Sequence, residues 1–106
     1  MTTFDKREEG FEKKFALDEE QKFKAVARRN RLLGLWTADR IGLTGSAADA
    51  YATDVVAAEF GVAGESDVVH KVVGDLDANG VPITSAEIRV RMDELMALAV
   101  VQVRSE

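Results

Sequence analysis

Basic side chains are concentrated in one short stretch of the chain, residues 22–31, which holds five lysine or arginine residues and no acidic residue. Arginine presents paired N–H donors that bind phosphate and carboxylate groups, so this stretch could hold a phosphate, a nucleotide or an acidic protein surface. A solvated basic face that balances acidic neighbours explains the same residues equally well. The candidate ligand-binding residues are Lys24, Arg28, Arg29, Asn30 and Arg31.

Residue types that perform catalysis or hold metals are scarce. The chain has no cysteine and a single histidine, His70, which excludes disulfides, thiolate nucleophiles and cysteine-based metal sites. Residues 75–80 match the first half of a calcium-binding EF-hand loop, but Ala86 stands where that loop needs a bidentate glutamate. The sequence shows no P-loop and no paired nucleophile and base. We therefore expect a protein that is not an enzyme and that binds no metal.

A second feature is the uneven distribution of charge. Residues 1–31 carry nine basic and seven acidic side chains, whereas residues 32–106 carry five and twelve. The acidic remainder would repel a polyanion, which argues against binding to nucleic acid. No apolar run is long enough for a membrane span or a signal peptide, so we expect a cytoplasmic protein without direct membrane insertion.

The N-terminal segment has only three large apolar residues before Leu17, and on a helix these phenylalanines would lie within about 40° of one another. A helix that faces a core needs an apolar face of about 100°, whereas a narrow line is typical of a helix that enters a partner's groove. Gly10 would weaken this helix by up to about 1 kcal/mol. Residues 1–17 are therefore predicted to be a mobile binding arm that becomes helical on docking, with a merely solubilising tail as the alternative. The candidate partner-binding residues are Phe4, Asp5, Arg7, Phe11, Lys14 and Phe15.

Apolar residues at helical spacing predict four helices that position these candidates, over residues 18–41, 46–61 or 46–64, 66–79 and 84–103. The predicted N-caps are Asp18, Ser46, Ser66 and Thr84. Short connections favour antiparallel neighbours, so the fold class is all-α, a compact four-helix bundle over residues 18–106 with a flexible N-terminal arm.

The inner faces of these helices can also be predicted. In the first helix, residues 32–36 are apolar on every side, which indicates a central position in the bundle, and Asn30 is expected to be a buried side chain with satisfied hydrogen bonds. The predicted inner face of this helix is Phe23, Val26, Ala27, Asn30, Leu33, Thr37 and Ile41. In the second helix it is Ala48, Tyr51, Val55, Ala58 and Val62.

Several runs of the sequence resemble the zeta subunit family of alphaproteobacterial F-type ATP synthases. They are MTTFDKRE at residues 1–8, KFA at 14–16, ARRNRLLGLW at 27–36, EIR at 87–89 and ELMA at 94–97. The resemblance implies a regulatory protein that inhibits ATP hydrolysis by inserting its N-terminal segment between the alpha and beta subunits, near the gamma rotor. It also implies peripheral association with the membrane-bound enzyme and no cofactor. Weak binding of ADP or ATP, described for some members, would suit the basic stretch. The alternative function is a stand-alone helical module that senses a nucleotide or another ligand through residues 28–31.

Overall fold

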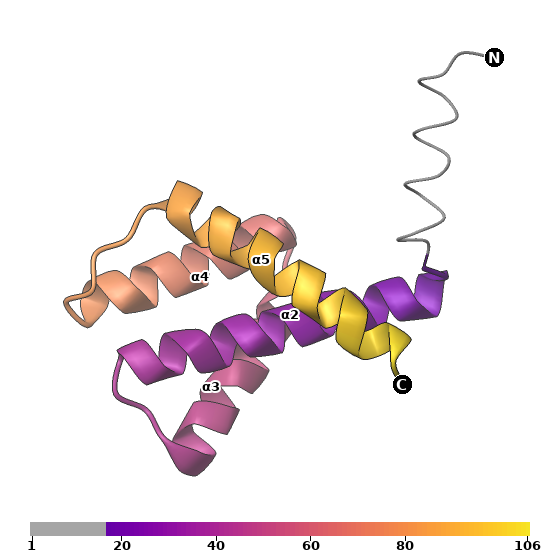
Figure 1. Ribbon diagram of the computed structural model, residues 1–106. Coiled ribbons are helices and arrows are strands. Elements are labelled where there is room, and N and C mark those ends of the chain that lie inside the picture. The colour runs from indigo at the N-terminus through magenta and orange to yellow at the C-terminus, as the bar shows by residue number, and fades with distance from the viewer. Residues whose placement is uncertain (1–16) are drawn as a thin grey trace.

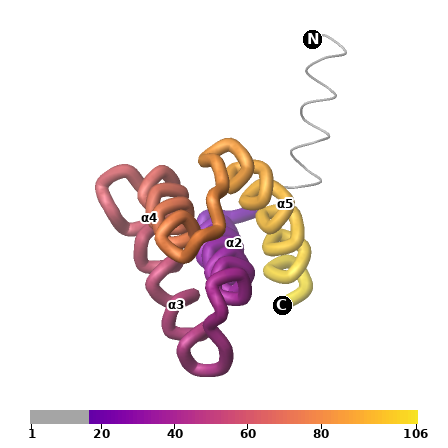
Figure 2. Tube along the Cα trace, turned by 90° about the vertical axis from the view of Figure 1, so that its left-hand side faces the viewer, coloured from indigo at the N-terminus to yellow at the C-terminus, as the bar shows by residue number. Residues whose placement is uncertain are grey.

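The computed structural model describes residues 17–106, and within them the predicted all-α fold is confirmed. The four helices are α2 (Glu19–Arg40), α3 (Gly45–Ala58), α4 (Glu65–Ala78) and α5 (Ser85–Arg104). Figure 2 shows α2 in the middle, with α3 and α4 on one side of it and α5 on the other, and Figure 1 shows α5 crossing α2 at an angle. The central position predicted for the apolar run at residues 32–36 is therefore confirmed.

Local sequence signals set the beginning of two helices. Asp18 caps α2 in a capping box, in which the Gln21 backbone N–H donates to the Asp18 carboxylate at 2.7 Å and the Asp18 N–H donates to the Gln21 side chain at 3.2 Å. Thr84 caps α5 by accepting from the Glu87 N–H at 3.1 Å. Both predicted caps are confirmed.

The other two predicted helix starts are wrong by one or two residues. α3 begins at Gly45 after Thr44, and α4 begins at Glu65 after Gly64, rather than at caps formed by Ser46 and Ser66. Gly64 has a φ of 57°, a conformation that glycine adopts without steric cost, so the backbone turns into α4 there. The second helix also ends at Ala58, before the predicted glycine stops.

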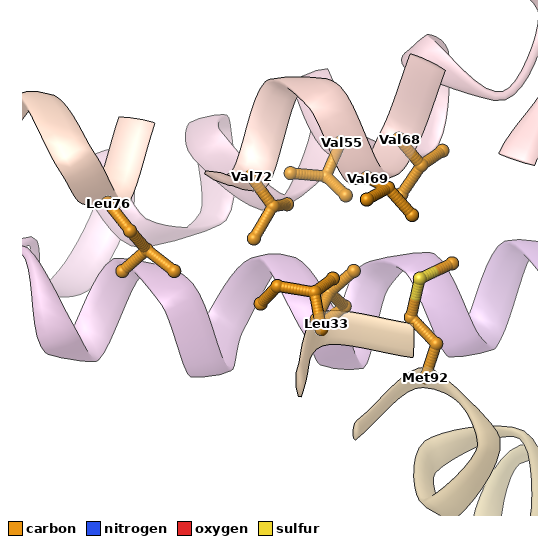
Figure 3. Close-up of a cluster of buried hydrophobic side chains, with 8 residues drawn as sticks. Leu33, Val55, Val68, Val69, Val72, Leu76 and Met92 are labelled. Carbon is orange, nitrogen blue, oxygen red and sulfur yellow. The ribbon is translucent and has the colours of Figure 1, made fainter. Parts of the chain in front are cut away.

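The hydrophobic core lies where α2 meets the other three helices (Figure 3). Leu33 of α2 is fully buried in it. The cluster consists of Leu33, Val55, Val68, Val69, Val72, Leu76, Ile88 and Met92. Phe23 and Val62, which were predicted to face inward, are instead exposed. In α2 the buried positions follow i, i+4 spacing from Ala25, and Phe23 lies about 160° around the helix from that residue, so both cannot face the core.

A polar contact joins α3 to α4 outside this core. The Tyr51 hydroxyl donates to Asp75 at 2.7 Å, and Lys71 pairs with the same carboxylate at 3.1 Å. The half-loop at residues 75–80 therefore uses its first carboxylate to hold a tyrosine of the neighbouring helix. Burial, followed by the hydrogen bond to Asp75 and the negative charges of Asp75 and Asp54, raises the pKa of Tyr51 well above its ordinary value.

This raised pKa predicts a loss of stability in alkali. The folded protein holds the Tyr51 phenol protonated, whereas in the unfolded chain the phenol ionises near pH 10. The contribution of Tyr51 to stability is therefore fully present below about pH 10 and is lost as the pH rises above it. Between pH 8 and pH 11 the free energy of unfolding should fall about 1 kcal/mol further in the wild type than in Tyr51→Phe. Urea unfolding of both proteins at each pH measures this difference. Parallel loss in the two proteins would contradict the assignment.

Candidate functional site

The six N-terminal candidates, Phe4, Asp5, Arg7, Phe11, Lys14 and Phe15, lie outside the described residues. The structure does describe where their segment joins the folded domain. Leu17 is half-buried and Asp18 closes the first turn of α2 through its capping box. The start of the helical domain is thus fixed by local hydrogen bonds, whereas the extent and mobility of the arm over residues 1–17 stay predictions.

The five candidates in the basic stretch separate into two groups, of which the first is buried. Arg29 is 6% exposed and Asn30 is fully buried, on the side of α2 that faces the end of α3. Arg29 Nε and Nη2 donate to Asn30 Oδ1 at 3.1 and 3.0 Å. Arg29 Nη2 and Asn30 Nδ2 both donate to Glu59 Oε1, at 2.9 and 2.8 Å. The prediction that Asn30 is a satisfied buried side chain is confirmed.

This Arg29–Asn30–Glu59 cluster joins α2 to the residue that follows α3. A buried charge is costly unless it is paired and hydrogen-bonded, and here one carboxylate serves two donors. Glu65, at the start of α4, lies 3.9 Å from Arg29 and adds a longer ion contact. A ligand would have to compete with these contacts for the polar atoms of Arg29 and Asn30, so the cluster is suited to holding α2 and α3 together.

The second group, Lys24, Arg28 and Arg31, lies at the surface and shares one hollow of about 390 Å³. Phe23, Ala27, Val56 and Glu106 complete its lining. Each cation has an acidic partner: Lys24 lies 3.4 Å from Glu20, Arg31 lies 3.3 Å from Asp49, and Arg28 pairs with Glu106. The hollow therefore combines three cations with an apolar floor, but carries little net positive charge.

Sequence reasoning missed an apolar groove beside this hollow, between the N-terminal half of α2 and the end of α3. We name it the α2–α3 groove; its volume is about 310 Å³. It is lined by Glu19, Lys22, Phe23, Val26, Ala27, Asn30, Val56, Glu59 and Phe60. The Phe23 and Phe60 rings lie 6.2 Å apart at an interplanar angle of 43° and stay 61% and 70% exposed. A phenylalanine two residues after the end of α3, Phe60, was the one local signal of this surface.

Residue types that perform catalysis or bind metals are not gathered into a site in residues 17–106. His70 is exposed, and no group of three or more histidine or acidic side chains in this part of the chain could hold a metal ion. Every buried side-chain nitrogen and oxygen among the described residues has a hydrogen-bond partner. None of the described helices combines the length and the apolar character needed to cross a membrane.

Comparison with known proteins identifies the family of this chain. No curated protein matches the chain. Another protein, whose structure was solved by solution NMR, is 48% identical in sequence. The two structures match with a TM-score of 0.68 over 79% of this chain and 95% of that one. A family model described as ATPase inhibitor subunit zeta matches residues 1–102, nearly the whole length. This match confirms the resemblance read from the sequence runs, and the chain belongs to the ATPase inhibitor subunit zeta family.

Proposed function

We propose that this protein inhibits ATP hydrolysis by the F-type ATP synthase by inserting its N-terminal segment at a catalytic interface between the alpha and beta subunits, near the gamma rotor. The observation that carries the proposal is that the family match begins at residue 1 and includes the whole charged segment ahead of the Asp18 cap. Inhibition is the role that the family's description gives, and the insertion mechanism is our proposal. An inhibitor subunit is a regulatory protein rather than a catalyst.

The proposed mechanism is mechanical and needs no covalent step. Phe4, Phe11 and Phe15 would enter an apolar groove of the enzyme as one line on a helix, while neighbouring charges such as Asp5, Arg7 and Lys14 find opposite charges on its walls. A catalytic interface must open and close in each turnover, so a wedge held in it stops hydrolysis. Rotation in the direction of synthesis would expel the N-terminal segment, so the protein would inhibit ATP hydrolysis but not ATP synthesis.

The folded domain would serve as the rigid base of this arm. The capping box at Asp18 fixes where the base begins, and about three turns further along α2 the Arg29–Asn30–Glu59 cluster holds this helix against α3. Linking the arm to a second contact on the domain would raise its effective concentration at the enzyme. The protein would then act in the cytoplasm, attached peripherally to the membrane-bound enzyme through the alpha, beta and gamma subunits.

A truncation tests this proposal. ATP hydrolysis by the purified cognate ATP synthase is measured with the full chain and with a version that lacks residues 1–16, which keeps the Asp18 cap and the entire core cluster. The full chain should slow hydrolysis by tenfold or more, and the truncated protein should have no effect at the same concentration. Circular dichroism and thermal unfolding show whether the truncated protein stays folded. Equal inhibition by both versions, or none by the full chain, would refute the proposal.

One observation favours a second function, the binding of an adenine nucleotide, because Lys24, Arg28 and Arg31 share one hollow next to the Phe23 ring. Arginine and lysine would bind the phosphates, and an aromatic ring can stack on a base. Titration of the protein with ADP, followed through backbone amide shifts, tests it. Shifts should cluster at these three cations and leave the buried Arg29 and Asn30 unchanged; the absence of shifts at the three cations would remove this function.

A further inference from the structure

The α2–α3 groove leaves two large aromatic side chains, which contact each other, mostly exposed to solvent. Phe23 and Phe60 are both more than half exposed, and Val62, two residues further along the chain, is fully exposed. Water contact with such apolar side chains is unfavourable, and a hollowed apolar patch on a small protein is typical of a binding surface. Neither phenylalanine contributes to the core cluster, so folding of this domain alone does not account for them.

The charges around the groove favour an apolar ligand. Lys22 and Glu19 at one end pair with each other at 3.4 Å. Glu59 at the other side accepts hydrogen bonds from Arg29 and Asn30. Because these charges are already paired, the groove offers mainly the apolar surfaces of its floor and of the two phenylalanine rings.

The groove also lies next to the point where the N-terminal arm begins. Glu19 lines it, and Phe15 precedes Glu19 by four residues, so the two can be at most about 14 Å apart even in an extended chain. A partner that holds Phe15 therefore comes within reach of the groove. The arm and the groove could then contact neighbouring parts of one partner.

The three phenylalanines of the arm cover less area by themselves than a stable complex buries on one partner. Its three phenylalanines would bury roughly 450–750 Å² in total, at about 150–250 Å² for each aromatic side chain. A stable complex buries about 800 Å² on each partner. A second apolar contact beside the arm would add to the area that its phenylalanines and charged side chains bury, and Phe23 and Phe60 are large side chains of the kind that contribute most to binding.

We infer that the α2–α3 groove is a second docking site for the ATP synthase, and that it accepts an apolar ridge of a helix on the enzyme surface next to the one that binds the arm. The inference rests on the proposed function. The side chains of Val26, Ala27 and Val56 are small and leave room for such a ridge beside the contacting rings of Phe23 and Phe60. This is the way in which a groove on one protein holds the apolar face of a helix from another.

Photo-cross-linking tests what occupies the groove. The photoreactive p-benzoylphenylalanine is placed in the full chain at position 60 or, as a control, at position 90. Val90 is 59% exposed on α5 and does not line the groove. With the purified cognate ATP synthase, position 60 should give at least tenfold more cross-linked enzyme subunit than position 90. Equal yields, cross-links to residues 1–16 of the same chain, or cross-links to a second copy would each overturn the inference.

A matched pair of substitutions then tests the contribution to binding. Phe60→Ser in the full chain should raise the concentration needed for half-maximal inhibition about tenfold, whereas Val90→Ser should leave it unchanged. Since both side chains are mostly exposed, both variants should keep the thermal midpoint of the wild type. If the wild type inhibits and Phe60→Ser inhibits equally well, the groove inference is wrong and the proposed function stands. If the wild type does not inhibit but still cross-links from position 60, the proposed function fails and the docking site remains.

Discussion

Replacing Glu59 with alanine is expected to lower the free energy of unfolding by about 3 kcal/mol. The Glu59 carboxylate accepts hydrogen bonds from Arg29 at 2.9 Å and from Asn30 at 2.8 Å, and both donors are buried. Without it, the Arg29 charge keeps only the Asn30 oxygen and the longer contact to Glu65 at 3.9 Å. The cost of leaving a buried charge without its counter-charge exceeds that of an exposed ion pair several times over.

Two further variants make this prediction specific. Glu59→Gln keeps an acceptor oxygen for both donors and removes only the charge, so its cost should be about 1 kcal/mol. Glu65→Ala removes a half-exposed carboxylate that lies 3.9 Å from Arg29 and 4.0 Å from Arg89, and should cost less than about 1 kcal/mol. Urea unfolding followed by circular dichroism measures all three proteins. If Glu59→Ala were no more harmful than Glu65→Ala, the cluster would not be a main link between α2 and α3.

Replacing Gly34 with alanine is expected to destabilise the protein by about 2 kcal/mol, although alanine is the better helix former. Gly34 lies where α2 crosses α3, and a Cβ atom there would come within 2.6 Å of the Ala52 Cα and 3.3 Å of the Val55 Cβ. Because the nearest of these atoms belongs to the backbone, the new methyl group can be accommodated only if the two helices move apart. That movement would loosen the core around Leu33 and Val55.

Gly74 provides the matched control for this substitution. It also lies inside a helix, α4, but a Cβ atom at this position would meet nothing within 4 Å. Gly74→Ala should therefore stabilise the protein by about 0.5–1 kcal/mol, through helix propensity alone. Thermal or urea unfolding of the two variants should give shifts of opposite sign. Shifts of the same sign would show that α2 and α3 do not depend on this close approach.

The features that could be predicted correctly are those that depend on residues close together in the sequence. The caps at Asp18 and Thr84 are interactions over three residues, so residue type and spacing suffice to identify them. The buried face of α5 repeats at helical spacing, with Ile88, Met92, Ala99 and Val103 all buried. The helix starts predicted at Ser46 and Ser66 were wrong. Gly45 and Gly64, both at positive φ, turn the backbone into α3 and α4 before these serines are reached.

The basic stretch of α2 could not be interpreted from its sequence, because five cations at residues 22–31 look alike until their neighbours are known. Arg29 faces inward since Glu59, thirty residues later in the chain, supplies a counter-charge at the end of α3. Phe23 faces outward although it is more apolar, because the buried positions of α2 follow the line from Ala25 to Leu33. Which line becomes buried depends on where α3 can approach, and Gly34 sets that position.

By itself, the sequence therefore determined the helices, two of their caps and the family. The helices and caps depend on the spacing of residues close together in the chain, and the family is identified from runs of residues that can be compared directly with those of its members. Only the tertiary structure decided which of the candidate side chains are buried, which share the surface hollow, and that Phe23 and Phe60 form a groove beside the start of the arm. The physical reason is that burial depends on contacts between helices far apart in the chain, and these contacts select one face of α2 from several that its sequence allows.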